Sequence, residues 1–215
     1  MDADVVDADG VGVRTYRGWV YSGVTLRAGR GAVVAVAGPG GSGRTSFLLT
    51  VAGRMKPTTG SLSVCGLALP RSAAKVRRRT AVARATGAAD LEPELRVADH
   101  VRERRLTLGR PARKHAKETF EQACELVGLD PAAKELVGEL GAADATRLAL
   151  ALALMERPEI VLLDDLDEGA DGSAQYDLWA AVRRTADTGV TVLAATNEAS
   201  PADGLADLVV ALGER

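Results

Sequence analysis

This 215-residue chain has few cysteines, no excess of either charge and no long hydrophobic run. The 27 Lys and Arg nearly balance the 29 Asp and Glu, so the net charge of −2 gives no reason to expect nucleic-acid binding. The longest apolar run, Leu148 to Met155, is far too short to span a membrane. The acidic N-terminus lacks the pattern of a secretory signal peptide. These absences predict a soluble chain located in the cytoplasm.

The only cysteines are Cys65 and Cys124. Their separation matches no metal-ligand spacing, so we interpret both as buried thiols of a cytosolic chain. Hydrophobic residues make up 47% of the chain, which excludes extensive disorder. The length is sufficient for one compact domain with its own core and an inserted subdomain.

A glycine-rich stretch at residues 38–46, Gly-Pro-Gly-Gly-Ser-Gly-Arg-Thr-Ser, is the feature around which the chain is organised. An apolar run at 32–37 leads into it, and a helix-like run at 46–54 follows it. This order of strand, turn and helix is typical of a phosphate-binding loop, because glycines let backbone N–H groups approach a phosphate closely. The residues predicted to contact a nucleotide here are Gly38, Gly40, Gly41, Ser42, Gly43, Arg44, Thr45 and Ser46.

Two other interpretations of this stretch remain open. Gly38, Gly40 and Gly43 also satisfy the dinucleotide-binding fingerprint G-x-G-x-x-G. That fingerprint needs an acidic residue about 20 positions further on, and residues 61–66 contain none. The other alternative is a glycine-rich turn without a ligand. The phosphate-binding loop is favoured because the required strand and helix flank it.

The pattern of the whole chain predicts an α/β fold. Short alternating stretches before Thr25 suggest a small antiparallel sheet edge. Apolar strands that alternate with helices predict a parallel sheet with helices on both faces. Apolar spacing predicts helices at 99–105 and 116–127, and Asp130-Pro131 is predicted to begin another short helix.

Two carboxylates follow the apolar strand predicted at 160–163. Asp164 and Asp165 are therefore expected at the carboxyl edge of the sheet, where ligands of such sheets bind. A carboxylate there can hold Mg²⁺ through water while the Thr45 hydroxyl ligates the ion directly. Thr45 and Asp164 are the predicted metal site.

With these features the chain resembles the nucleotide-binding subunits of ATP-binding cassette (ABC) transporters. Residues 140–144 lie where that family has its LSGGQ signature, and residues 163–171 lie on its Walker B and D-loop stretch. The resemblance covers nearly all of the chain. It implies a P-loop NTPase (RecA-like) core with a small antiparallel β edge and an inserted helical subdomain. The implied division is a nucleotide-binding core at 1–85 and 145–215, with a helical subdomain and signature-like segment at 86–144.

The resemblance also implies roles for single residues. ATP and Mg²⁺ would bind at the glycine-rich loop, and Tyr16 falls near the position of the aromatic residue that stacks on adenine. Asp165 falls on the catalytic glutamate of the family, and Asn197 falls on its switch histidine. Asp165 and Asn197 are therefore the implied catalytic residues.

Five of the family's catalytic elements are altered together in this chain. Arg44 replaces the usual lysine, Asp165 is one methylene shorter than glutamate, and Asn197 cannot carry the charge of histidine. Residues 83–85 contain no glutamine, and 140–144 have alanines where the signature has glycines. The loss of all five suggests that fast hydrolysis is no longer the task of this chain.

The sequence thus predicts the ATP-binding subunit of an ABC-type membrane transporter, with slow or lost hydrolysis of ATP. It would lie on the inner face of the membrane, bound to an integral membrane subunit and to a second nucleotide-binding subunit, with no nucleic-acid partner. The alternative is a non-hydrolysing structural or regulatory subunit of a membrane assembly. A P-loop kinase of a small molecule is disfavoured, because residues 140–171 fit the cassette layout.

Overall fold

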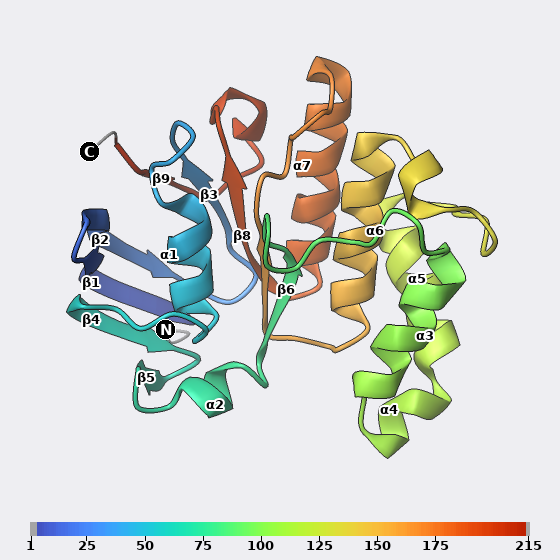
Figure 1. Cartoon of the computed structure of the whole chain (residues 1–215), viewed down its shortest axis with the longest axis horizontal. Helices are drawn as coiled ribbons and strands as arrows, with labels where there is room; N and C mark the ends of the chain where they lie inside the picture. The colour runs from blue at the N-terminus through green and yellow to red at the C-terminus, as the bar shows by residue number, and fades with distance from the viewer. Residues whose placement is uncertain (1–3, 214–215) are drawn as a thin grey trace.

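The computed structural model describes residues 4–213, except for the side chains of residues 110 and 111. Within these residues the strands form two sheets (Figure 1). The antiparallel sheet has, in spatial order, strands β2 (Gly18–Ala28), β1 (Val6–Thr15), β4 (Thr59–Val64) and β5 (Leu67–Leu69). The parallel sheet has, in spatial order, strands β6 (Thr80–Arg84), β7 (Ile160–Leu163), β8 (Thr191–Thr196), β3 (Val33–Ala37) and β9 (Leu208–Ala211).

The helices fall into three groups. Helix α1 (Arg44–Val51) lies beside both sheets. The four-residue helix α2 (Ala73–Val76) follows β5, the last strand of the antiparallel sheet, in the chain. The other face of the parallel sheet is covered by α6 (Ala142–Leu154) and α7 (Gly172–Asp187). Beyond them lie α5 (Ala116–Val127), α3 (Val97–Thr107) and α4 (Arg110–Lys114), at the right of Figure 1. Short 3₁₀ turns are formed by Val137–Glu139 and Ser200–Ala202.

The parallel strands are apolar throughout because both faces of their sheet are covered. In β3, Val33 and Ala35 belong to the cluster with α6 and α7, whereas Val34 and Val36 belong to the cluster with α1 and the antiparallel sheet. Successive side chains of a strand point to opposite faces, so a doubly covered strand needs apolar residues at every position. All five residues of β3 are buried.

Helix α1 connects the two sheets through one shared core. Phe47 is fully buried and meets the ring of Tyr21 on β2 edge to face, with 5.6 Å between the ring centroids. Leu48 and Val51 belong to the same cluster. Burial of one such side chain typically contributes about 1.5–3 kcal/mol to stability. The helix that starts at the glycine-rich loop is therefore anchored by its apolar face.

The predicted α/β fold is confirmed, including the antiparallel edge, the parallel sheet and the helices at 97–107 and 116–127. The prediction of a helix that begins at Asp130-Pro131 is wrong, because this segment contains only a turn. The carbonyls of Ala133 and Glu135 accept hydrogen bonds of 3.0 Å from the N–H groups of Ala98 and Val97, at the start of α3. They therefore cannot accept the bonds that would propagate a helix of their own.

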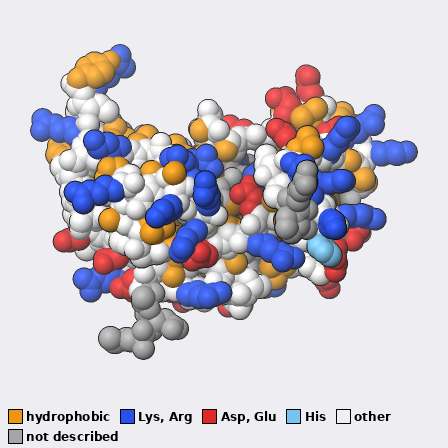
Figure 2. All heavy atoms as spheres, turned by 90° about the horizontal axis from the view of Figure 1, so that it is seen from below, with side chains coloured by type: hydrophobic (Ala, Val, Ile, Leu, Met, Phe, Trp, Pro, Cys, Tyr) orange, Lys and Arg blue, Asp and Glu red, His pale blue; other side chains and the backbone are white. Residues whose placement is uncertain are grey.

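The end of the molecule that carries α2 is rich in basic side chains. Figure 2, which views the molecule from below, shows Lys and Arg side chains spread over this face. The cluster Lys75, Arg77, Arg78 and Arg79 is exposed. Within the described part of the chain its one ion pair joins Arg79 to Glu159 at 3.5 Å. The cluster is a solvated face.

Among residues 4–213, no helix is both long enough and apolar enough to cross a lipid bilayer.

Asp207 connects three elements at the start of β9. Its Oδ2 atom accepts a 2.7 Å hydrogen bond from the Val33 N–H of β3 and a 2.8 Å bond from Arg183 of α7. Partial burial opposes ionisation of Asp207. The hydrogen bond from Val33 and the Arg183 guanidinium outweigh it, and the pKa of Asp207 is below its ordinary value. The ionised form of Asp207 therefore stabilises the folded chain.

We expect Asp207→Asn to lower the free energy of unfolding at pH 7 by about 1 kcal/mol, since a charge-assisted contact is lost from a half-exposed carboxylate. The folded pKa is lowered, so this contribution is complete above the unfolded pKa of about 3.9 and is lost as the pH falls below it. Urea unfolding of both proteins at neutral and acid pH measures the difference.

Asp203→Asn is the matched control, because Asp203 is exposed and forms no ion pair among residues 4–213. If the difference in the free energy of unfolding between Asp207→Asn and the wild type stays constant down to acid pH, the proposed role of the Asp207 charge is contradicted.

Candidate phosphate and metal site

The candidate site lies at the carboxyl edge of the parallel sheet. Strand β3 runs into the glycine-rich loop, and strand β7 runs into Asp164. Strand β8 pairs with both and lies between them, with Ala37 opposite Thr196 and Leu163 opposite Ala194. Since all three strands are parallel, their carboxyl ends meet at one edge. The fold therefore brings the loop and the carboxylates together, as the sequence predicted.

Close packing around the loop explains two of its glycines. A Cβ atom on Gly38 would lie 2.3 Å from the carbonyl oxygen of Leu212, and one on Gly43 would lie 2.3 Å from that of Val20. Gly43 also has a φ of +95°, which favours glycine. Gly40 is different, because a Cβ there would meet nothing within 4 Å. The loop is thus held on both sides by backbone.

Thr45 and Asp164 contact each other directly. The Thr45 hydroxyl donates a 2.5 Å hydrogen bond to Asp164 Oδ2. Asp164 is fully buried, and its other oxygen has no hydrogen-bond partner within the described residues. Burial raises the pKa of Asp164, the bond from Thr45 partly offsets this, and the neighbouring Asp165 raises the pKa further. A buried carboxylate with one unpaired oxygen beside a hydroxyl fits a hard cation such as Mg²⁺.

No group of three or more acidic, His or Cys residues able to hold a metal occurs in residues 4–213. Thr45 and Asp164 alone would leave most positions around a magnesium ion open. Mg²⁺ usually keeps several waters and takes its other ligands from phosphate groups. The donor set therefore fits a metal that arrives with a phosphate compound.

Arg44 and Asp165 form a buried ion pair. Arg44 Nη2 lies 2.9 Å from Asp165 Oδ1, and the two side chains are 8% and 18% exposed. The other terminal nitrogen of Arg44, Nη1, is buried without a hydrogen-bond partner among residues 4–213. Asp165 has a φ of +43°, in the left-handed region. The structure thus brings together Arg44, which was predicted to contact a nucleotide, and Asp165, which the resemblance implied to be catalytic.

Two residues of this site were not assigned a role from the sequence. Thr86 donates a 2.9 Å hydrogen bond to Asp165 Oδ2, and Arg84 donates a 3.4 Å bond to the Asp165 carbonyl. Arg84 also forms an ion pair with Glu168. Arg84 ends β6 and Thr86 lies two residues beyond it, and β6 is the neighbour of β7 in the sheet. Their position at the end of an apolar strand was the sequence feature that could have identified them as residues of the site.

Three further predicted residues lie outside the hydrogen bonds and ion pairs of this cluster. Tyr16 is 90% exposed in the turn between β1 and β2, and its ring stacks on the Arg17 guanidinium at 5.2 Å. Asn197 directly follows β8 and is exposed. Ser46 lies in the first turns of α1, where its carbonyl accepts a 2.7 Å bond from Thr50. Within the described residues, no hydrogen bond or ion pair joins Tyr16 or Asn197 to the carboxylates of Asp164 and Asp165.

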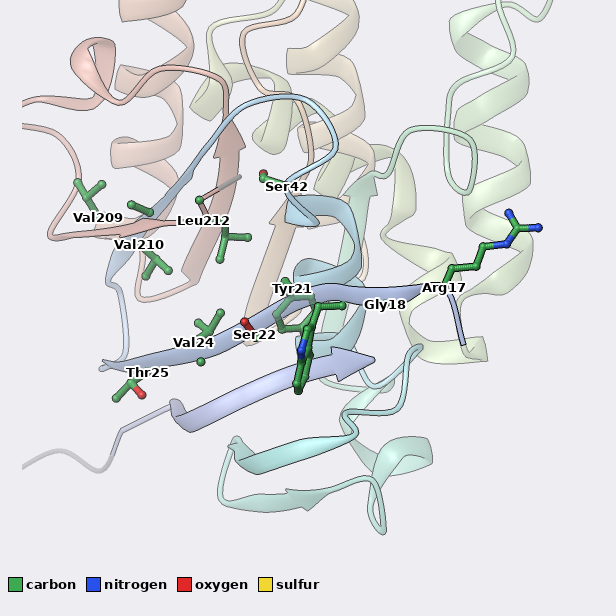
Figure 3. Close-up of a pocket in the computed structure, with 14 residues that line it drawn as sticks. Arg17, Gly18, Tyr21, Ser22, Val24, Thr25, Ser42, Val209, Val210 and Leu212 are labelled. Atoms are coloured by element: carbon green, nitrogen blue, oxygen red, sulfur yellow. The ribbon is translucent and has the colours of Figure 1, made fainter. Parts of the chain in front are cut away.

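A cleft of about 730 Å³ lies beside the loop (Figure 3). It runs between the edge strands β2 and β9, and Trp19, Tyr21, Val209 and Leu212 are among its lining residues. Ser42 is the residue of the loop that lines it. The four residues joined by the contacts described above, Arg44, Thr45, Asp164 and Asp165, do not line the cleft.

The segment at 140–144 begins helix α6 at Ala142. Asp144 forms a 2.7 Å ion pair with Arg147 one turn later, so its charge is compensated within the chain. The methyl group of Ala142 lies close to Gly169, where an added Cβ would be 3.1 Å away. Ala142 thus packs closely against the backbone near Gly169, and Asp144 is paired within its own helix.

Comparison with known proteins agrees with this geometry. A family model described as "ABC transporter" matches residues 21–167. The "Nod factor export ATP-binding protein I" of Burkholderia lata is 29% identical over 198 residues, covering 91% of this chain and 63% of that protein. The "Daunorubicin resistance ATP-binding protein DrrA3" of Streptomyces coeruleorubidus is 31% identical over 210 residues, covering 97% and 65%. The chain spans less than two thirds of the length of these relatives.

Solved structures share the fold. The structure of cbiO1 from Clostridium perfringens, described as part of the ABC transporter complex cbiONQ, superposes with a TM-score of 0.82 at 16% identity, covering 98% of this chain and 85% of that one. The dimeric structure of MJ0796, a bacterial ABC transporter cassette, gives a TM-score of 0.79 at 20% identity, covering 97% and 94%. The fold is therefore that of a P-loop NTPase, as predicted.

The loop packing predicts unequal effects for two alanine substitutions. We expect Gly38→Ala to lower the free energy of unfolding by about 1–3 kcal/mol, because the new methyl group would collide with the Leu212 carbonyl. Gly40→Ala is the matched control in the same loop, since open space surrounds it. Thermal and urea unfolding measure both. Equal stabilities of the two variants would contradict the close contact between the loop and the end of β9.

Proposed function

The chain belongs to the ABC transporter family, and we propose that it is the ATP-binding subunit of a membrane transporter with slow or absent ATP hydrolysis. The observation that carries this proposal is the contact of Thr45 with Asp164 at the mouth of the glycine-rich loop. This contact supports the proposal, because it joins a hydroxyl and a buried carboxylate beside the loop that would bind the phosphates of a nucleotide.

In the proposed complex the loop binds the phosphates of ATP. Backbone N–H groups of residues 40–46 and the start of α1 supply partial positive charge, and the Arg44 guanidinium supplies a full one. Thr45 and Asp164 would hold Mg²⁺, which reduces the negative charge of the phosphates when bound. The unpaired Asp164 Oδ1 and Arg44 Nη1 support this arrangement, because each lacks the kind of partner that Mg-ATP would supply. Tyr16 is the proposed contact for adenine.

Slow hydrolysis follows from the residues around the proposed phosphate. Both carboxylate oxygens of Asp165 already accept hydrogen bonds, from Arg44 and Thr86, so this side chain is poorly placed to orient water. Misplacement by about 1 Å can reduce a rate roughly 10²-fold. Asn197 has no charge to offer, and residues 83–85 contain no glutamine. The methyl groups at 142 and 143 would hinder approach of this segment to a phosphate.

The proposed assembly follows the family. Residues 1–85 and 145–215 would form the nucleotide-binding core, and 86–144 the helical subdomain. The subunit would lie on the cytoplasmic face of a membrane, with an integral membrane subunit and a second nucleotide-binding subunit as partners. The names of the relatives, which refer to Nod factor export and daunorubicin resistance, support a part in export.

A second candidate is a non-hydrolysing structural or regulatory subunit. The Arg44–Asp165 ion pair favours it, because the pair engages both residues that hydrolysis would require. Titration with a labelled ATP separates the two candidates. Binding below millimolar concentration supports the ATP-binding subunit, whereas no binding near millimolar concentration would leave the structural role.

We expect Arg44→Ala to weaken ATP binding about 10- to 150-fold, since a charge-assisted hydrogen bond contributes about 1.5–3 kcal/mol. Equilibrium titration with labelled ATP and Mg²⁺ measures the change. Arg79→Ala is the control, because Arg79 lies on the basic face that carries α2 and pairs with Glu159. Unchanged affinity in Arg44→Ala would show that this loop does not bind the phosphates.

The ATPase rate of the chain tests the proposed loss of hydrolysis. We expect very slow turnover in the wild type and a faster rate in the double variant Asp165→Glu, Asn197→His, which restores the longer carboxylate and an imidazole. No rise would mean that the loop or the 140–144 segment limits the rate instead. A wild-type turnover of about 1 s⁻¹ or more would overturn the proposal of slow hydrolysis.

A further inference from the structure

The Arg44–Asp165 pair uses the guanidinium group that a phosphate would use. Arg44 Nη2 donates to Asp165 Oδ1 at 2.9 Å, while its Nη1 atom stays buried and unpartnered within residues 4–213. Carboxylates and phosphates both accept hydrogen bonds from a guanidinium in the same planar geometry. A carboxylate already placed on the guanidinium therefore competes with an arriving phosphate.

Burial makes this competition significant. Arg44 is 8% exposed, and a buried guanidinium without an anion would be strongly destabilising. Asp165 compensates that charge while no phosphate is present. A phosphate that arrives must either displace Asp165 or share Arg44 with it, and in the second case two anions lie close together. Either way the apparent affinity for the phosphate compound is reduced.

Asp165 is held in place by groups other than Arg44. Thr86 donates a 2.9 Å hydrogen bond to Asp165 Oδ2, the oxygen that Arg44 does not use. Arg84 bonds the Asp165 carbonyl and so restrains the backbone in its left-handed conformation. The carboxylate has both oxygens occupied and little freedom to turn away. Thr86 thus acts on Arg44 through Asp165.

We propose that Asp165 is an internal competitor for the phosphate-binding guanidinium of Arg44, with Thr86 as its positioning residue. The proposal rests on the proposed function, because it concerns the affinity of the same loop for a nucleoside di- or triphosphate. In the nucleotide-free protein the ion pair keeps the loop in a low-affinity state. Release of Asp165 from Arg44 raises the affinity.

Binding of ADP without added metal tests this, because neither hydrolysis nor the metal site then contributes. We expect Asp165→Asn to bind labelled ADP about tenfold tighter than the wild type, on the scale at which about 1.4 kcal/mol is a factor of ten. Thr86→Val keeps the Asp165 charge and removes one restraint, so a smaller gain of about threefold is expected. Asp203→Asn is the matched control, because it also removes one negative charge, and Asp203 is exposed and forms no ion pair among residues 4–213. Its affinity should equal that of the wild type.

Making the Asp165→Asn change in the Arg44→Ala variant separates competition for the guanidinium from simple repulsion between the Asp165 charge and the phosphate. There Asp165→Asn should give no gain, because the contested guanidinium is gone. A gain of the same size would overturn the proposal, as would equal affinities of wild type, Asp165→Asn and Thr86→Val. Thr86→Val keeps the test valid if Asp165→Asn does not fold, since the ion pair stays intact. If the wild type and every variant bind no ADP, the proposed function fails, and the competitor role fails with it.

Discussion

The hydrogen bond from Thr45 to Asp164 and the ion pair between Arg44 and Asp165 join residues that are 119 and 121 positions apart. Both contacts exist only because β3 and β7 are parallel and end at the same edge of the sheet, one strand apart. Both are largely buried, so loss of one partner would leave a polar or charged group without compensation.

The site has two opposite electrostatic requirements within a few residues. Asp164, fully buried with one unpaired oxygen, requires a cation, and burial keeps its pKa high without one. Arg44, also buried, requires an anion, and Asp165 is the anion that the chain supplies. The proposed magnesium–phosphate compound would supply both charges. This match explains why the cluster fits a family whose members are named as ATP-binding proteins.

The departures from the family pattern have different physical consequences. Asp144 forms an ion pair with Arg147 one turn later, so its negative charge has a partner within the chain. At position 165 the shorter carboxylate does not leave a gap, because it lies against Arg44 and Thr86. Arg44 and Asp165 are thus linked through one contact. Such coupling is typical of neighbouring residues in a buried network.

Much of the fold and part of the site were predictable from local pattern. Uniformly apolar strands marked a doubly covered sheet, and the glycine-rich loop between strand and helix marked the phosphate site. These features depend on residues that are adjacent in sequence or recur with the period of one element. The predicted pairing of Thr45 with Asp164 also needed only the rule that parallel strands share a carboxyl edge.

Tertiary structure alone decided how the side chains at that edge are paired. Nothing local indicates that Asp165 contacts Arg44, or that Thr86 completes its hydrogen bonds, because these residues lie on three different strand ends. The segment after Asp130 has the pattern of a helix start, but the carbonyls of Ala133 and Glu135 bond to the start of α3 instead. Helical and glycine-rich patterns are properties of short segments, and the sequence by itself determines them. The partner of a buried charge depends on which segments meet, and only the folded chain determines that.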